Sequence, residues 1–561
     1  MAEQPSAASY EKFFKSLRES RSTFNNLMDE CRHYFLPNRP SFVGHLPEGE
    51  DRYDELYTSA PALARKQLAT AVGHTLRPGD RNWIRPTPRS AKLREDSESL
   101  AWCREAQSVA YSLIYDPRSR FEEKASEVDD DTVAFGQGVL YQNFDPANGH
   151  IIYRSRPLSS TFFMQGVTGI TDQVHCLYPM SLREFVQAFG EEALSDKRRR
   201  QWEATGDRSK TEQKGKCEVV HAVMPQQIAK RFGLPATRHR YASYWIDLEE
   251  KKVVRTGGYK RFPYVIPRWD TVSEEALARS PAMIALADAK TANAIARTLL
   301  EVGEVAARPP LVAAFEMIKG DVELYPGGVT YIDGQGLAYF QGKPIQAIDT
   351  GHQIPLTLEI LQAVETRIRD TFHLSMLLMP TNKDMTVDEV RARTEELVRF
   401  TGPIMQRLLS DYNVPIVEYA VYSAIENGML PDMPQQMEDS GGMEVICEGP
   451  LTMARQRAAA YRSIESMQSI LPLAEVQPQA LEVVDWDRMV SSIVMGLVDD
   501  ASLLKPLEEV KAMREQQQQM MQLQQGLEAA QAAGGAAKDL AAADQQSDGM
   551  IQSMLGGMTG A

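Results

Sequence analysis

The feature that most constrains the fold is a pair of long predicted helices on either side of a glycine-rich module. Ser280 is a suitable helix cap and Pro281 a favoured first helical residue, so a helix is predicted over 282–307. Arg308-Pro309-Pro310 ends it, because proline cannot continue a helix. Small side chains at nearly every turn permit close approach of neighbouring helices, and we expect packing at Ala285, Ala289, Ala292 and Ala296.

The module between the two helices extends to residue 351 and is punctuated by glycines, which predicts strands and turns. Pro355 then opens the second helix. Its apolar residues recur along one side at helical spacing, namely Leu358, Leu361, Val364, Ile368 and Phe372. The chain is therefore organised here as helix, small module, helix.

A polar loop and a capped helix follow directly. The loop consists of Met379, Pro380, Thr381, Asn382, Lys383 and Asp384. Thr386 and Glu389 match a capping box, in which each side chain satisfies a backbone N–H at a helix start. Gly402-Pro403 interrupts the helical pattern that follows, so we predict a kink or a restart there.

The remaining patterns predict an α+β fold that is mainly helical. Helices are expected at 10–35, 60–76, 98–115, 120–135, 181–189, 415–427, 452–471 and 487–514. Strands are expected at 83–86, 139–141, 151–153, 161–164, 174–178, 219–224, 241–247 and 443–447. At 561 residues, the chain is expected to contain three or more structural units.

Composition narrows the function classes. The formal charge of −15 argues against a protein whose main task is to grip nucleic acid, which requires a basic footprint. No apolar run is long enough for a membrane span and the start of the chain does not resemble a signal peptide, so we expect a cytosolic product that contacts no membrane. The five scattered cysteines fit reduced thiols. From residue 515 a Gln/Ala/Gly/Met-rich tail predicts mobility.

The basic segment at 197–200 and the polar stretch at 205–216 have two interpretations. They could form a nucleic-acid patch. A solvated helix end followed by a flexible insertion is the interpretation that we favour.

Catalytic motifs are not found. Gly136-Gln137-Gly138 lacks the third glycine of a dinucleotide loop, and Pro344 stands where a phosphate loop needs Ser or Thr. Asp129-Asp130-Asp131 with Glu127 could bind a divalent cation, but on a helix these carboxylates point to different sides, and a solvated helix end is favoured. We expect no enzyme, no cofactor and no metal site.

Several local motifs, in this order and spacing, resemble one protein family. They are Tyr34-Phe35-Leu36-Pro37, Leu56-Tyr57-Thr58-Ser59 with Leu68-Ala69 and Trp83, Gly136-Gln137-Gly138-Val139-Leu140-Tyr141, and Met385-Thr386-Val387-Asp388-Glu389-Val390-Arg391 with Gly402-Pro403. Nearly the whole chain resembles the head-to-tail connector, or portal, proteins of short-tailed bacteriophages.

The resemblance implies a dodecameric ring at one capsid vertex of the virion, assembled in the host cytoplasm. Double-stranded DNA would pass through its central channel during packaging and ejection. The implied partners are the terminase large subunit, a tail adaptor protein, and the major capsid and scaffolding proteins.

The resemblance also implies a division of the chain. Residues 1–280 and 386–448 would form the wing, 281–308 and 352–375 the two stem helices, 309–351 the clip, 376–385 the tunnel loop, 449–511 the crown and 512–561 a mobile tail. Arg308, Lys319 and Lys343 would be clip contacts to partners.

Two alternatives stay open at this point. One is another ring protein of the virion, such as a tail adaptor, although adaptors are generally much smaller. The other is a metal-dependent nuclease that uses Asp129, Asp130 and Asp131. A hollow ring would distinguish a connector from a monomeric enzyme.

Overall fold

A computed structural model describes residues 7–44, 53–79, 82–205, 217–273, 275–307, 354–373, 402–447 and 460–468, with short pieces between 311 and 347 and between 486 and 522. The chain divides into two compact units. The first consists of 1–86, 104–432 and 444–452, and the second of 87–103, 433–443 and 453–561. The mixture of helices and antiparallel sheets confirms the α+β class.

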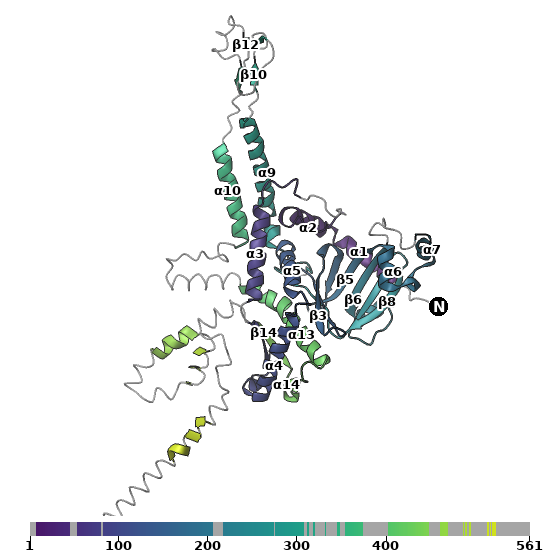
Figure 1. The fold of residues 1–561 in the computed structure, drawn as a ribbon, viewed down its shortest axis with the longest axis vertical. Coiled ribbons are helices and arrows are strands. Elements are labelled where there is room, and N and C mark those ends of the chain that lie inside the picture. The colour runs from purple at the N-terminus through teal and green to yellow at the C-terminus, as the bar shows by residue number, and fades with distance from the viewer. Residues whose placement is uncertain are drawn as a thin grey trace, which may run out of the picture. The chain divides into compact units, whose positions relative to one another are not determined.

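The largest sheet has five antiparallel strands in chain order, all in the first unit (Figure 1). The strands are β4 (Thr161–Gln165), β5 (Thr171–Met180), β6 (Cys217–Pro225), β7 (Tyr241–Asp247) and β8 (Lys252–Tyr259). The first four were predicted. Strand β8 was not, because most of its residues are exposed or half-buried and lack a clean alternation.

Helices cover both faces of this sheet. Successive strand residues point to opposite faces, so one set packs with α1 (Ala8–Ser20) through Tyr10 and Phe14. The other set packs with α6 (Leu182–Phe189), which begins at a capping box formed by Ser181 and Glu184. Two short helices, α7 (Asp196–Thr205) and α8 (Gln226–Arg231), complete the sheet region.

A smaller sheet joins the helical part of the same unit. Strands β2 (Leu140–Asp145) and β3 (His150–Ser155) form the predicted hairpin, and β9 (Tyr264–Val265) pairs with the other edge of β2. The main helices of this part of the chain are α2 (Ser22–Phe35), α3 (Ala60–Leu76), α5 (Phe121–Phe135), α9 (Pro281–Ala307), α10 (Ile354–Thr371) and α13 (Val414–Glu426).

The single helix predicted over 10–35 is wrong in one respect, because the chain breaks at Arg21 between α1 and α2. No proline or glycine marks the break. The Arg21 guanidinium is buried and donates to the carbonyl oxygens of Leu158 and Thr161, so tertiary contacts fix the break rather than local sequence.

The helix predicted to begin at Pro415 is confirmed as α13, which starts one residue earlier at Val414. Residues 402–408 are already helical, and a π-helical turn at Leu409–Asn413 joins them to α13. The predicted end is confirmed, since Gly428 follows α13 in the left-handed region at φ 69°.

The remaining described elements are short. In the module between α9 and α10, β10 (Leu311–Ala313) pairs with β13 (Ile345–Ala347), and β11 (Ile318–Lys319) pairs with β12 (Tyr331–Ile332). Elsewhere β1 (Ile84–Pro88) pairs with β14 (Met443–Cys447). The helices α4 (Ser97–Ile114) and α14 (Gln435–Asp439) complete the set. None of the described helices is both long and apolar enough to span a bilayer.

Candidate functional site

Helices α9 and α10 form an antiparallel hairpin (Figure 1), and residues 308–353 connect them in the sequence. Arg367, near the end of α10, pairs with Asp288, near the start of α9, at 3.2 Å, which fixes the opposite directions of the two helices. Val364, Ile368 and Phe372 on α10 are buried. The start of α9 and the end of α10, which we call the root of the hairpin, are therefore packed against the rest of the unit.

The root of α9 lies against α2 and α5 along its stripe of small residues. The stripe consists of Ala285, Ala289, Ala292 and Ala296, which are all buried. Ser280 caps the helix: its Oγ accepts the Met283 N–H at 3.0 Å and donates to the carbonyl of Ala134 at 2.9 Å. The cap thus ties the start of α9 to the end of α5.

Polar bonds fix the hairpin further along its length. Lys290 on α9 pairs with Glu30 on α2 at 2.7 Å. Asn293 Oδ1 accepts the Tyr57 N–H at 2.7 Å, and its Nδ2 donates to the Glu55 carbonyl at 2.9 Å. Thr58 donates to Glu365 on α10 at 3.2 Å. The segment before α3 therefore clamps both helices.

The hairpin also presents large apolar side chains to solvent. Ile284 is 73% exposed and Leu300 57% on α9, while Leu358 and Ile360 are exposed on α10. These side chains are available to pack against another protein.

Three consecutive aspartates of α5 hold the segments around this root together. Asp129 forms a salt bridge with Arg77, and Asp130 forms one with Arg65. Asp131 forms a salt bridge with Arg39, with 2.7 Å between the nitrogen and the oxygen. Asp129 and Asp131 are almost fully buried. The predicted solvated helix end is therefore wrong, although the three carboxylates do point in different directions.

Burial and pairing act against each other on these charges. Burial raises the pKa of Asp131 to about 6, although the Arg39 charge opposes this shift. Burial alone would lower the pKa of Arg77, but the neighbouring Asp129 carboxylate outweighs it and raises that pKa. Each carboxylate already has a cationic partner, which leaves this triplet unsuited to a metal. In the part of the chain that the structure describes, no cluster of His, Cys, Asp or Glu is placed to hold a metal ion.

The π-helical turn is anchored to α3, to α5 and to the segment before α9. Asn413 Nδ2 donates to the Leu76 carbonyl at 2.8 Å, and Tyr412 Oη donates to the Ala125 carbonyl at 3.2 Å. Asp411 pairs with Arg268 at 3.0 Å. Three consecutive residues of the turn therefore reach three different segments.

Only some of the predicted site residues fall in the part of the chain that the structure describes. Met379, Pro380, Thr381, Asn382, Lys383, Asp384, Arg308 and Lys343 lie outside the described residues. Lys319 is the last residue of β11. Gly402 is buried and Pro403 is exposed, and they begin the helical residues 402–408. The kink stays a prediction, because residues 374–401 lie outside the described part of the chain.

The basic segment is corrected in part. Arg198 is buried and bonds Asp247 and also Glu249, the latter at 2.7 Å, so it fastens α7 to the end of β7. It is not a solvated residue. Residues 206–216 lie outside the described part of the chain.

Sequence reasoning missed Arg39, Arg65 and Arg77 as partners of the aspartates. They precede the aspartates by 52 to 92 residues, and nothing local distinguishes them from surface arginines. The one available signal was that the three adjacent carboxylates precede the apolar end of the helix, Val133-Ala134-Phe135, because charges that are buried beside apolar residues are normally paired.

Comparison with known proteins gives a consistent result. The family model described as "Bacteriophage head to tail connecting protein" matches residues 7–504. A probable portal protein of Bordetella phage BPP-1 is 25% identical over 535 residues, which cover 92% of each chain. The portal protein of Salmonella phage epsilon15 is 26% identical over 396 residues, which cover 68% of each chain.

Proposed function

The chain belongs to the bacteriophage head to tail connecting protein family, and from this premise we propose that twelve copies form a ring around a channel for double-stranded DNA. Membership makes it a head-to-tail connector, or portal protein, at the junction of head and tail in a phage virion. The ring, its channel and its partners are the content of the proposal.

The observation that carries the proposal is the α9–α10 hairpin. Its root is fixed to the body by the Ser280 cap, the alanine stripe and the Asn293 bonds. Its outer faces present Ile284, Leu300 and Ile360 to solvent. A pair of helices that is fixed at one end and carries exposed apolar side chains suits a stem in which hairpins of neighbouring copies pack around a channel.

We assign the other segments of the chain relative to this stem. Residues 309–351 form the clip, which contacts the terminase large subunit during packaging and the tail adaptor protein afterwards, with Arg308, Lys319 and Lys343 as contact residues. Residues 376–385 form the tunnel loop at the lumen. The wing is formed by 1–280 and 386–448, and it faces the major capsid and scaffolding proteins. The crown is formed by 449–511.

The net negative charge of the chain supports a channel through which DNA slides rather than a surface that binds DNA tightly. Each neutralised phosphate adds affinity for DNA through counterion release, and therefore adds friction to sliding. A ring of chains that each carry −15 repels the polyanion overall. Isolated contacts such as Lys383 would then act on DNA without holding it.

The test is electron microscopy of the purified chain, with mass photometry of the same sample. We expect hollow rings with a central channel and a mass near twelve times 62.8 kDa. A sample that contains only monomers or dimers at every concentration, with or without scaffolding protein, would overturn the proposal.

A further inference from the structure

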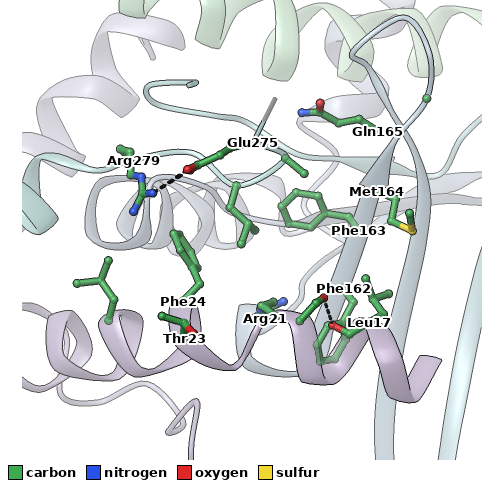
Figure 2. A pocket seen from close by; sticks show the side chains of 15 residues that line it. Leu17, Arg21, Thr23, Phe24, Phe162, Phe163, Met164, Gln165, Glu275 and Arg279 are labelled. Atoms are coloured by element: carbon green, nitrogen blue, oxygen red, sulfur yellow. Dashed lines mark hydrogen bonds and ion pairs between the residues drawn. The ribbon is translucent and has the colours of Figure 1, made fainter. Parts of the chain in front are cut away.

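A groove lies where α1, α2, strand β4 and residues 275–279 meet (Figure 2). Its volume is about 730 Å³. Apolar side chains make up most of its wall, namely Leu17, Phe24, Leu27, Phe162, Phe163 and Leu277. Arg279 and Glu275 pair at 2.8 Å at one rim. An apolar hollow of this size is suited to side chains of another segment.

The groove contains a buried cation. Arg21 is only 6% exposed and lines the groove between the two helices. Its guanidinium donates to two backbone carbonyls and to Asn25 Oδ1, but no carboxylate of the described residues pairs with it. Burial lowers the pKa of Arg21 to about 10, so it stays charged at neutral pH.

A buried cation without a counter-charge favours an occupant that supplies one. The ionisable lining residues are Arg21, Arg279 and Glu275, which leaves a formal charge of +1. Coulomb attraction is stronger in such a poorly hydrated place than in bulk water. The groove, which we call the Arg21 groove, therefore matches a segment with large apolar side chains and adjacent carboxylates.

This chain carries such a segment at residues 53–57, Tyr-Asp-Glu-Leu-Tyr. Tyr53 is 51% exposed and Tyr57 41% exposed, and the Glu55 side chain is 84% exposed. The bonds from Asn293 to Tyr57 and Glu55 hold the backbone of the segment against α9. The Asp54 and Glu55 carboxylates are thus exposed on a fixed support. The Tyr53 hydroxyl donates to Asn38 Oδ1 at 3.0 Å, and the Tyr57 ring centre lies 6.0 Å from the Arg297 guanidinium, so both rings would leave these contacts on docking.

One copy cannot place this segment in its own groove. The groove lies at the N-terminal end of α2, around Arg21, and Glu55 lies beside His33 near the C-terminal end, at 3.8 Å. The 14 residues of α2 separate the two places by about 20 Å. Two different complementary patches on one chain produce head-to-tail contacts, which close into a ring when the rotation permits.

We infer that residues 53–57 of one copy dock in the Arg21 groove of the next copy around the ring. The aromatic side chains enter the apolar part of the groove, and the Asp54 or Glu55 carboxylate faces the Arg21 guanidinium. This inference rests on the proposed ring. It names the residues of a contact within it.

Disulfide trapping tests the contact directly. All five native cysteines are buried, so cysteines introduced at the exposed positions Thr23 and Asp54 report on their own surroundings. In the double variant Thr23→Cys/Asp54→Cys, mild oxidation of rings should give a ladder of covalent multimers on a non-reducing gel. The two sites are too far apart within one copy for an internal disulfide.

Two controls sharpen the result. Each single variant should give no ladder, and neither should Thr23→Cys/Gln187→Cys, in which the second cysteine is on α6. An equal mixture of Thr23→Cys and Asp54→Cys chains, assembled together, should give covalent dimers only. Absence of a ladder in intact rings of the double variant would overturn the inference.

Charge variants supply a second measurement. Asp54→Lys/Glu55→Lys places cations against Arg21 and should raise the subunit concentration at half assembly by about tenfold or more. Asp54→Asn/Glu55→Gln should have a smaller effect in the same direction. The matched control is Glu122→Lys/Glu123→Lys, another adjacent acidic pair that is exposed on α5, and it should assemble normally.

The outcomes separate this contact from the ring itself. If the unmodified chain forms no rings, the proposed function fails. If rings form, but the ladder is absent and the lysine variant assembles as well as its control, the docking contact alone is wrong. A ladder that stops at covalent dimers of the double variant would indicate a two-fold contact and would also overturn the head-to-tail arrangement.

Discussion

The guanidinium of Arg77 lies 4.6 Å from the centre of the Tyr412 ring, and it bonds Asp129 as well. Arg77 directly follows α3, Asp129 is on α5, and Tyr412 is in the π-helical turn before α13. One buried cation therefore joins three segments that are far apart in sequence. Two of these segments, α3 and α5, also pack against α10 and α9 of the helical hairpin that we propose as the stem.

Removing this cation should destabilise the chain strongly. Arg77→Met leaves the Asp129 carboxylate buried without its partner, and such a change typically costs about 3–5 kcal/mol. Urea unfolding should show that loss for Arg77→Met. The double variant Arg77→Met/Asp129→Leu should be more stable than Arg77→Met alone, because no lone charge remains. A double variant that is less stable than both single variants would contradict this account.

Acid should weaken the five-stranded sheet through two buried histidines. Burial lowers the pKa of His175 and of His221 to about 3, against a usual value of 6.5. Below pH 6.5 the unfolded chain takes up protons that the folded imidazoles do not, so stability falls as the pH falls from 6.5 towards 3. At pH 5 the loss is roughly 2 kcal/mol for each histidine.

Unfolding measured at pH 7.5 and at pH 5.0 checks this expectation. His221→Asn should reduce the difference between the two pH values, and the exposed His74→Gln should not. An unchanged pH dependence in His221→Asn would show that other groups cause the acid sensitivity.

Gly136 and Gly169 together test whether steric crowding adds to the cost of a left-handed backbone conformation. Its φ is 81°, and an added Cβ would lie 2.6 Å from the Ala278 carbonyl oxygen. Gly169 has a similar φ of 74° but open space around it. Gly169→Ala should cost about 1 kcal/mol from the left-handed conformation alone. Gly136→Ala should cost clearly more, because the chain just before α9 must also shift. Equal melting temperatures of the two variants would contradict the crowding at Gly136.

The buried and exposed sides of α10 should respond differently to substitution. Ile368→Ala empties a fully buried position and should lower the stability of the isolated chain by about 2–5 kcal/mol. Ile360→Asp, at an exposed position, should leave that stability nearly unchanged but reduce ring assembly if hairpins pack against one another. Mass photometry and thermal unfolding on the same samples separate the two effects. Normal assembly of Ile360→Asp would place this face outside the contact between copies.

The tunnel-loop proposal is tested by substitutions that spare the ring. Lys383→Ala and Thr381→Ala should leave ring assembly intact but change DNA retention or packaging yield, since they alter local contacts to the polyanion. In vitro packaging with nuclease protection measures this yield. Unchanged packaging in both variants would contradict the role assigned to 376–385.

The sequence predicted most elements because their signals are local. Ser280 marks the start of α9, and Gly428 follows the end of α13. The errors arise where distant contacts decide. Arg21 breaks a continuous helical pattern, and Asp129 and Arg198 are buried because arginine or aspartate partners come from other segments. A charge on a helix has the same local signature whether water or a distant arginine neutralises it.

The π-helical turn has a consequence for the segment that leads into it. It contains one residue more than an α-helical turn would need for the same rise. Each residue of an α-helix rotates the side chains by about 100°. Residues 402–408 therefore present their side chains in directions offset by about this angle from those of an uninterrupted helix through Val414–Glu426. Removing one residue at 409–413 would re-aim that segment while its axis stays in place.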